Sequence, residues 1–161
     1  MSALLDACRG FPEITFPPGG VLVEEGTRTG ALYVLIEGEV AVLRGGVEVA
    51  AVKEAGSVFG EMSILLDTAH SATVVSRKTS RAYAIEDGAL FMRSRPDAMF
   101  LVGRILALRV HLLTSYLVDV KQQFSDRNDH LGMVDTILEG LCQQQDREFT
   151  PGSDREPHPG L

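Results

Sequence analysis

The sequence is poor in the residues and runs that mark several large classes of protein. Its two cysteines, Cys8 and Cys142, lie far apart and match no metal-binding or redox spacing. Residues 1–10 carry Asp6 and lack the apolar core of a signal peptide, and no apolar run approaches the roughly 18–20 residues of a membrane span. We therefore expect a cytoplasmic protein with reduced thiols, no iron–sulfur cluster and no membrane partner.

Positive charge is also scarce. The chain has 15 Lys and Arg against 22 Asp and Glu, which gives a net charge of −7. The last 37 residues contain eight acidic residues, three arginines and no lysine, so they carry a net charge of −5 and offer little to a phosphate backbone. We expect no nucleic-acid partner.

Signatures of catalysis are missing as well. The histidines never form the His-x-His pair of a metal-dependent cupin, and neither Gly-x-Ser-x-Gly nor a Walker loop occurs. We expect no enzyme activity, no catalytic residues and no metal site. What the chain does have is an ordinary globular composition, 45% apolar and 23% charged, and enough length for one good core.

Residues 14–92 are typical of a series of short β-strands separated by glycines. Short strands with a turn signal every 8–12 residues predict a sandwich or a closed roll. Gly45-Gly46 stands between two of the runs and predicts a two-residue hairpin turn. The predicted strands lie within Val21–Glu25, Ala31–Glu37, Glu39–Arg44, Val47–Val52, Ser71–Ser76 and Ser80–Glu86.

The apolar pattern changes to a helical period after Arg95, and Pro96 suits a first helical turn. A second apolar stripe accompanies the first, so one stripe can pack on the β-region while the other needs a partner. We expect a parallel homodimer through residues 97–124; the alternative is that both stripes are buried within one chain. The first stripe is Val102, Leu106, Val110, Leu113, Leu117, Val120 and Phe124, with heptad-like spacing, and the second is Leu101, Ile105, Leu108 and Leu112.

The remaining residues predict two further segments after a domain that covers residues 1–124. Residues 125–145 are expected to form a short helical appendage, in which Leu131–Leu141 is a candidate docking helix for a partner protein. Residues 146–161 are polar and contain three prolines, which predicts a disordered tail.

The segment from Gly56 to Val74 contains most of the candidate ligand-binding residues. Gly60 allows the backbone to approach a ligand closely, and Glu61 places a carboxylate beside it. Met62 and Ser63 suit the start of a helical turn, whose N–H groups can hold an anion. A titratable donor and two hydroxyls follow after a short loop, at His70, Ser71 and Thr73. This combination favours a nucleotide, with ribose and phosphate.

The same segment resembles the phosphate-binding cassette of the cyclic nucleotide-binding domain family. The family pattern is Phe-Gly-Glu-Leu-Ala followed by Pro-Arg-Ala/Ser-Ala-Thr-Val, and here the matching stretches are Phe59–Ser63 and Ala69–Val74. Earlier stretches resemble the family's first strands, namely Phe16–Gly19, Glu24–Gly26 and Leu32–Val40. The resemblance covers roughly Phe11 to Phe124. It implies an α+β fold: an antiparallel, jelly-roll-like β-roll with a short N-terminal helix, a long C-terminal helix and an extra helical segment.

The resemblance also implies roles for individual residues. Glu61 would accept a hydrogen bond from the ribose 2′-hydroxyl, helped by the Gly60 backbone. The cyclic phosphate would be held by the backbone N–H groups around Met62 and Ser63 and by those of Ser71 and Ala72, with the Ser71 hydroxyl in reach of the phosphate or the purine. In family members of the catabolite activator type, a Thr-Ser pair on the long helix contacts the purine, and Thr114-Ser115 lies at about that distance; a polar break in the dimer seam is the equal alternative. The candidate ligand-binding residues are Phe59, Gly60, Glu61, Met62, Ser63, His70, Ser71, Ala72, Thr73, Thr114 and Ser115.

One position departs from the family pattern, because His70 stands where the family has the arginine that pairs with the phosphate. Losing that charged hydrogen bond costs roughly 1.5–3 kcal/mol, or about 10- to 150-fold in affinity. Three interpretations stay open: weak nucleotide binding, binding by a protonated His70, or a fold that has lost its ligand. A fourth is that His70 is an ordinary surface residue. If His70 does hold the phosphate, affinity should rise as the pH falls from about 7.5 towards 6.

The resemblance therefore predicts a regulatory module that binds a cyclic nucleotide and signals through an unidentified protein partner. Cyclic AMP is the first expectation and cyclic GMP the second, and no other cofactor is implied. The alternative is a domain of the same fold, without a ligand, that serves dimerisation or docking.

Overall fold

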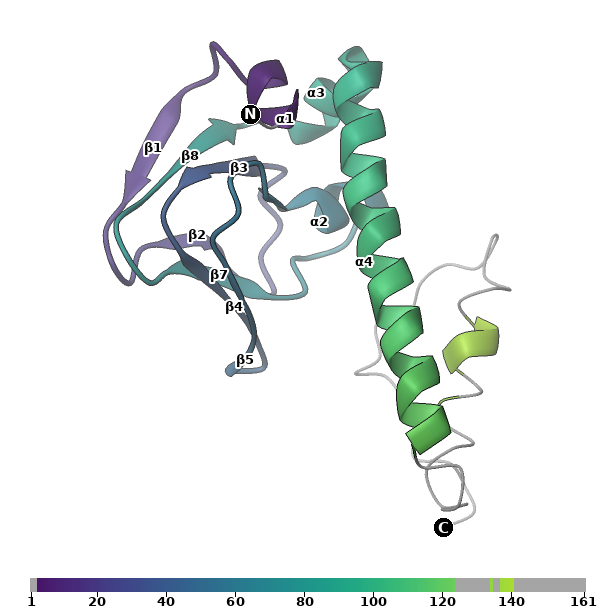
Figure 1. Cartoon of the computed structure of the whole chain (residues 1–161). Coiled ribbons are helices and arrows are strands. Elements are labelled where there is room, and N and C mark those ends of the chain that lie inside the picture. Colours follow the sequence, from purple (N-terminus) through teal and green to yellow (C-terminus); the bar gives the residue numbers. More distant parts are fainter. Residues whose placement is uncertain (1–2, 124–133, 135–136, 141–161) are drawn as a thin grey trace. The chain divides into compact units, whose positions relative to one another are not determined.

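The computed structural model describes residues 3–123, 134 and 137–140, and it divides the chain into two compact units, Met1–Leu106 and Ala107–Leu161 (Figure 1). The described helices are α1 (Ala3–Ala7), α2 (Glu61–Leu66), α3 (Gly88–Ser94) and α4 (Pro96–Gln123). The strands are β1 (Glu13–Phe16), β2 (Val21–Val23), β3 (Leu32–Glu37), β4 (Val40–Arg44), β5 (Val47–Val52), β6 (Val58–Phe59), β7 (Thr73–Ser76) and β8 (Ser80–Ile85).

The strands form two four-stranded sheets, with the orders β1-β8-β3-β6 and β2-β7-β4-β5. Every pair of neighbours is antiparallel. The predicted antiparallel β-roll is confirmed, and each of the six predicted runs contains a strand. At the β4–β5 hairpin, Gly45 and Gly46 both have positive φ, 57° and 77°, as the predicted two-residue turn requires.

Strand β3 separates two hydrophobic cores. Side chains alternate along a strand, so Leu32 and Val34 enter one core while Leu35 enters the other. The first core lies against the helices, with Leu4, Phe91, Met92, Ala98 and Val102 among its members. The second lies inside the roll, with Leu22, Val23, Val40, Phe59, Val74 and Ala82. This two-sided burial explains why β3 is almost continuously apolar in sequence.

Helix α3 precedes α4 and was not predicted, because most of it falls within residues 14–92, which the sequence assigned to strands. The Asp87 carboxylate caps α3 by accepting a hydrogen bond from the Leu90 N–H at 2.8 Å. Arg95 then leaves the helical region, with φ −130° and ψ 80°, because the residue before a proline avoids the α conformation. Pro96 begins α4 as predicted.

Helix α4 has two contrasting stretches. In the first unit, Ala98 and Val102 are buried in the helix-side core. In the second unit, several large apolar side chains are at least half exposed: Leu108, Val110, Leu112, Leu113 and Tyr116. The predicted homodimer through residues 97–124 would cover such side chains, and it stays a prediction.

No uninterrupted apolar run has the length of a membrane span, yet α4 is long and apolar enough to cross a membrane by length and composition alone. An 18-residue window of α4 has a mean hydropathy of 1.5. The polar residues of α4 are spread along the helix, so they divide its apolar residues into short runs but lower the mean hydropathy only slightly. One such helix is weak evidence for a span, since the core helix of a soluble protein passes the same test.

The C-terminal predictions fall mostly outside the described residues. Residues 134 and 137–140 are helical, within the predicted appendage 125–145. The rest of that appendage and the predicted tail, 146–161, lie outside the described part of the chain.

Candidate functional site

The cassette begins at Gly60, between β6 and α2. Gly60 has φ +93°, and a Cβ atom at this position would lie 2.4 Å from the carbonyl oxygen of Ala31. A side chain is therefore excluded both by conformation and by contact. The sequence predicted close backbone approach at this glycine, and the structure places the Ala31 carbonyl there.

Helix α2 carries the next three candidate residues in its first turn. Glu61 and Ser63 are buried, whereas Met62 is 45% exposed. The Ser63 hydroxyl donates to the Thr68 carbonyl at 2.5 Å, which closes the turn after α2. Glu61 is thus a buried residue at the start of α2, and it is the residue to which the resemblance assigns the ribose contact.

His70 is buried, with 5% of its surface exposed, so the interpretation as a surface residue is wrong. Its Nε2 lies 3.0 Å from the Thr29 hydroxyl. Burial lowers the pKa of His70 from its ordinary value of 6.5, so the ring is neutral near pH 7. The imidazole is thus an uncharged, hydrogen-bonded group in this structure.

The loop between β2 and β3 holds the cassette from the other side. The His70 N–H donates to the Thr27 carbonyl at 2.8 Å, and the Gly26 N–H donates to the His70 carbonyl at 2.9 Å. Arg28 pairs with Asp67 through two contacts: one guanidinium nitrogen lies 2.7 Å from Oδ1 and the other donates to the backbone carbonyl at 2.6 Å. Sequence reasoning missed Thr29 and Arg28, because partners about 40 residues apart leave no local signal.

Of the candidate residues after His70, Ser71 and Ala72 lie in the bend before β7 and Thr73 is the first residue of that strand. Ser71 is exposed, and Ala72 and Thr73 are half-buried. The Thr73 hydroxyl accepts a hydrogen bond from the Glu25 N–H at 3.0 Å, so it also ties the cassette to the β2–β3 loop. Phe59, at the other end of the cassette, is buried in the core of the roll.

Thr114 and Ser115 lie on α4 in the second unit. Their hydroxyls donate to the carbonyls of Val110 and His111, at 2.8 and 2.9 Å, four residues earlier in the helix. The two units are not placed relative to one another, so a purine contact by this pair stays a prediction.

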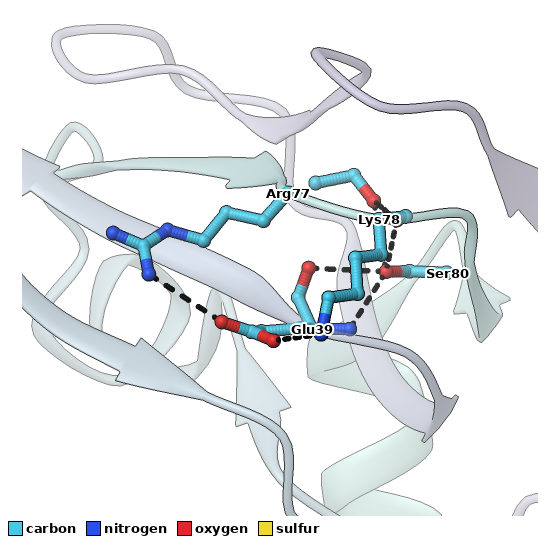
Figure 2. Close-up of polar contacts among 5 residues, drawn as sticks. Glu39, Arg77, Lys78 and Ser80 are labelled. Carbon is cyan, nitrogen blue, oxygen red and sulfur yellow. Dashed lines mark hydrogen bonds and ion pairs between the residues drawn. The ribbon is translucent and has the colours of Figure 1, made fainter.

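A second polar cluster joins β4 to the β7–β8 turn. Figure 2 shows the Glu39 carboxylate between Arg77 and Lys78, with Lys78 Nζ at 2.9 Å and an Arg77 nitrogen at 3.4 Å. The side-chain hydrogen bond from Lys78, followed by that from Arg77, lowers the pKa of Glu39. Beneath them the buried Ser80 hydroxyl accepts from the Glu39 N–H at 3.1 Å and from Ser76 at 2.8 Å. This cluster fixes the turn and is charged on its outer side.

Comparison with known proteins identifies the class of the domain. Residues 13–92 match the family model described as "Cyclic nucleotide-binding domain". That match spans the β-roll, the cassette and most of α3. Residues 13–92 therefore belong to the cyclic nucleotide-binding domain family, as the sequence predicted.

Individual relatives agree with this assignment. Over 70 residues the chain is 34% identical to a cGMP-dependent protein kinase of Plasmodium berghei (strain Anka), which is 44% of this chain and 8% of that kinase. The catabolite activator protein of Thermus thermophilus has a TM-score of 0.60 at 20% identity, covering 94% of this chain and 88% of that one. The N-terminal domain of a Streptomyces coelicolor A3(2) transcriptional regulator has a TM-score of 0.51 at 26% identity, covering 68% and 82%.

Proposed function

We propose that this chain is a regulatory module whose cassette binds a ribose-containing purine ligand and whose α4 passes the bound state to a protein partner. The observation that carries the proposal is the pairing of Gly60 and Glu61 within a domain of this family. The glycine brings two backbone segments together, and the buried carboxylate beside it is an acceptor suited to a sugar hydroxyl. Cyclic AMP is the first cyclic nucleotide to test, and cyclic GMP the second.

Side-chain packing connects the cassette to the start of α4, and this supports a regulatory role. Ile64 of α2 packs against the helix-side core, which also contains Phe91 of α3 and Val102 of α4. Gly88 lets the helices approach closely: a Cβ there would lie 2.4 Å from Ile64 Cδ1. A ligand that favours one position of α2 can therefore bias the start of α4, to the extent of its differential affinity for the two positions.

The test is isothermal titration of the full chain with cyclic AMP and cyclic GMP at pH 6.0 and 7.5, repeated with Glu61→Gln. A cassette that uses this carboxylate loses affinity in the variant, whereas Val49→Gln, at an exposed position of β5, should leave affinity unchanged. Light scattering of the same samples, with and without ligand, tests the homodimer and its response.

A second candidate function is an interaction module that has no ligand. It is favoured by His70, which is buried, neutral and already bonded to Thr29. Absence of heat and of a thermal shift with every purine ligand at millimolar concentration would support it. The cytoplasmic location, the lack of enzyme activity and the lack of a nucleic-acid partner stay predictions.

A further inference from the structure

The cassette is negatively charged where a cyclic nucleotide would bring a further negative charge. Residues 60–73 include Glu61 and Asp67 and contain no lysine or arginine. A buried or half-buried anion needs a paired charge or several charge-assisted hydrogen bonds to offset its lost hydration. The segment itself supplies no permanent cation for this purpose.

His70 does not supply the missing charge in this structure. The ring is 5% exposed, and its Nε2 faces the Thr29 hydroxyl at 3.0 Å. Protonation would place a cation in a site that burial makes unfavourable to it, as the lowered pKa reflects. The group that stands at the phosphate-pairing position is therefore a neutral hydrogen-bonding ring.

Arg28 brings a guanidinium to the cassette, but its charge is balanced there. Both of its contacts go to Asp67, one to the carboxylate and one to the backbone carbonyl, at 2.7 and 2.6 Å. The pair is a surface ion pair, with 57% of the Arg28 side chain and 93% of the Asp67 side chain exposed, and a ligand phosphate would have to displace Asp67 to use this guanidinium. Counting Arg28 with the segment still leaves a net charge of −1.

The hydroxyl chemistry of the two ligand types points the same way. A 3′,5′-cyclic phosphate occupies two ribose oxygens and leaves only the 2′-hydroxyl as a sugar donor. The parent nucleoside keeps three hydroxyl donors and carries no charge. A site built around the buried Glu61 carboxylate, which only accepts hydrogen bonds when ionised, is better matched to donors than to a phosphate.

We propose that the cassette prefers an uncharged purine nucleoside to the corresponding 3′,5′-cyclic nucleotide. This inference rests on the proposed function, namely that the cassette binds a ribose-containing purine. It concerns which member of that ligand class the residues select.

The experiment compares adenosine with cyclic AMP and guanosine with cyclic GMP, by isothermal titration of the full chain at pH 7.5. We expect one nucleoside to bind about 10-fold or more tightly than its own cyclic phosphate, the effect of one missing charged hydrogen bond. His70→Arg should strengthen cyclic nucleotide binding about 10-fold and so narrow or cancel the preference for the nucleoside. Val49→Arg adds the same charge at an exposed position of β5 and should leave the ratio unchanged.

The outcomes separate this inference from the proposed function. Tighter binding of a cyclic nucleotide than of its nucleoside by the unmodified chain overturns the inference and leaves the proposed function standing. Binding of neither ligand type overturns both. The comparison on the unmodified chain decides the matter even where His70→Arg fails to fold.

Discussion

The two polar clusters of the β-roll differ in where they place charge. At the β7–β8 turn, Glu39, Arg77 and Lys78 keep their charges near solvent and leave only hydroxyls buried beneath them. In the cassette the buried, neutral His70 ring faces the hydroxyl of Thr29, which is itself exposed. The first arrangement costs little desolvation, while the second depends on one hydrogen bond in a desolvated site. Hence the cassette should be the more sensitive of the two to any change that adds charge or volume.

The largest expected effect follows from Gly60→Ala. The substitution forces a side chain into positive φ and against the Ala31 carbonyl, so we expect a loss of roughly 3 kcal/mol or more in the free energy of unfolding. Gly19→Ala is the matched control, because Gly19 has a similar φ of +83° with nothing within 4 Å of the added Cβ, and it should cost about 1–2 kcal/mol. Urea denaturation measures both; equal losses would show that contact with Ala31 is unimportant.

Next comes Ser80→Ala in the second cluster. Ser80 is 1% exposed, and its hydroxyl joins the Glu39 N–H to the Ser76 hydroxyl. Removing it takes the acceptor from the Glu39 N–H and one donor from the Lys78 carbonyl, for an expected loss of about 2 kcal/mol in unfolding free energy. An unchanged denaturation midpoint would mean that another group or a water replaces the hydroxyl.

Thr29→Val tests the corresponding bond in the cassette and should cost less, about 1 kcal/mol, because Thr29 itself is exposed. The variant keeps the shape of the side chain and removes the oxygen that faces His70 Nε2. The same denaturation assay applies. A loss larger than that of Ser80→Ala would reverse the ranking of the two clusters.

The two clusters should affect the stability of the protein in different pH ranges. Because burial lowers the pKa of His70, the unfolded chain binds the proton more readily, so stability should fall as the pH drops below about 6.5. His70→Gln should flatten that part of the curve. Melting temperatures between pH 7.5 and 5.5 measure it, and an identical slope in the two proteins would assign the effect to other groups.

The smallest expected effect concerns Glu39, whose lowered pKa adds stability above its ordinary value of 4.5, stability that is lost as the pH falls through the lowered value. Lys78→Ala removes the first cause of the shift and should reduce the loss of melting temperature between about pH 5 and pH 3. Because Lys78 is 73% exposed, the effect should also shrink in high salt. A salt-independent effect would argue against an ion pair.

Much of the fold could be predicted because its signals are local. Runs of five to seven residues, the Gly45-Gly46 pair and the proline that begins α4 each act on their own neighbourhood, and the structure has strands, a turn and a helix start at those places. Strand β6 was missed because two residues, Val58 and Phe59, are too short for a periodic pattern. Helix α3 was missed because seven residues make only about two turns, too few for a helical period to stand out beside the strand pattern.

The cassette could be located from sequence, but its chemistry could not be completed. Gly60, Glu61 and His70 stand in one motif, and the family resemblance gives their order. The hydrogen-bond partner of His70 is Thr29, which lies 41 residues away in the chain and outside the motif. Burial, and with it the direction of the pKa shift, is likewise a property of the packed chain.

The backbone bonds between the β2–β3 loop and His70 have a consequence for kinetics. Because Gly26 donates to the His70 carbonyl and Thr27 accepts from the His70 N–H, neither segment can open without breaking the bonds of the other. The loop and the cassette should therefore exchange their amide hydrogens as one cooperative unit, at a common rate. A ligand that needs this unit open would associate more slowly than diffusion allows, with the opening step setting the pace of the response.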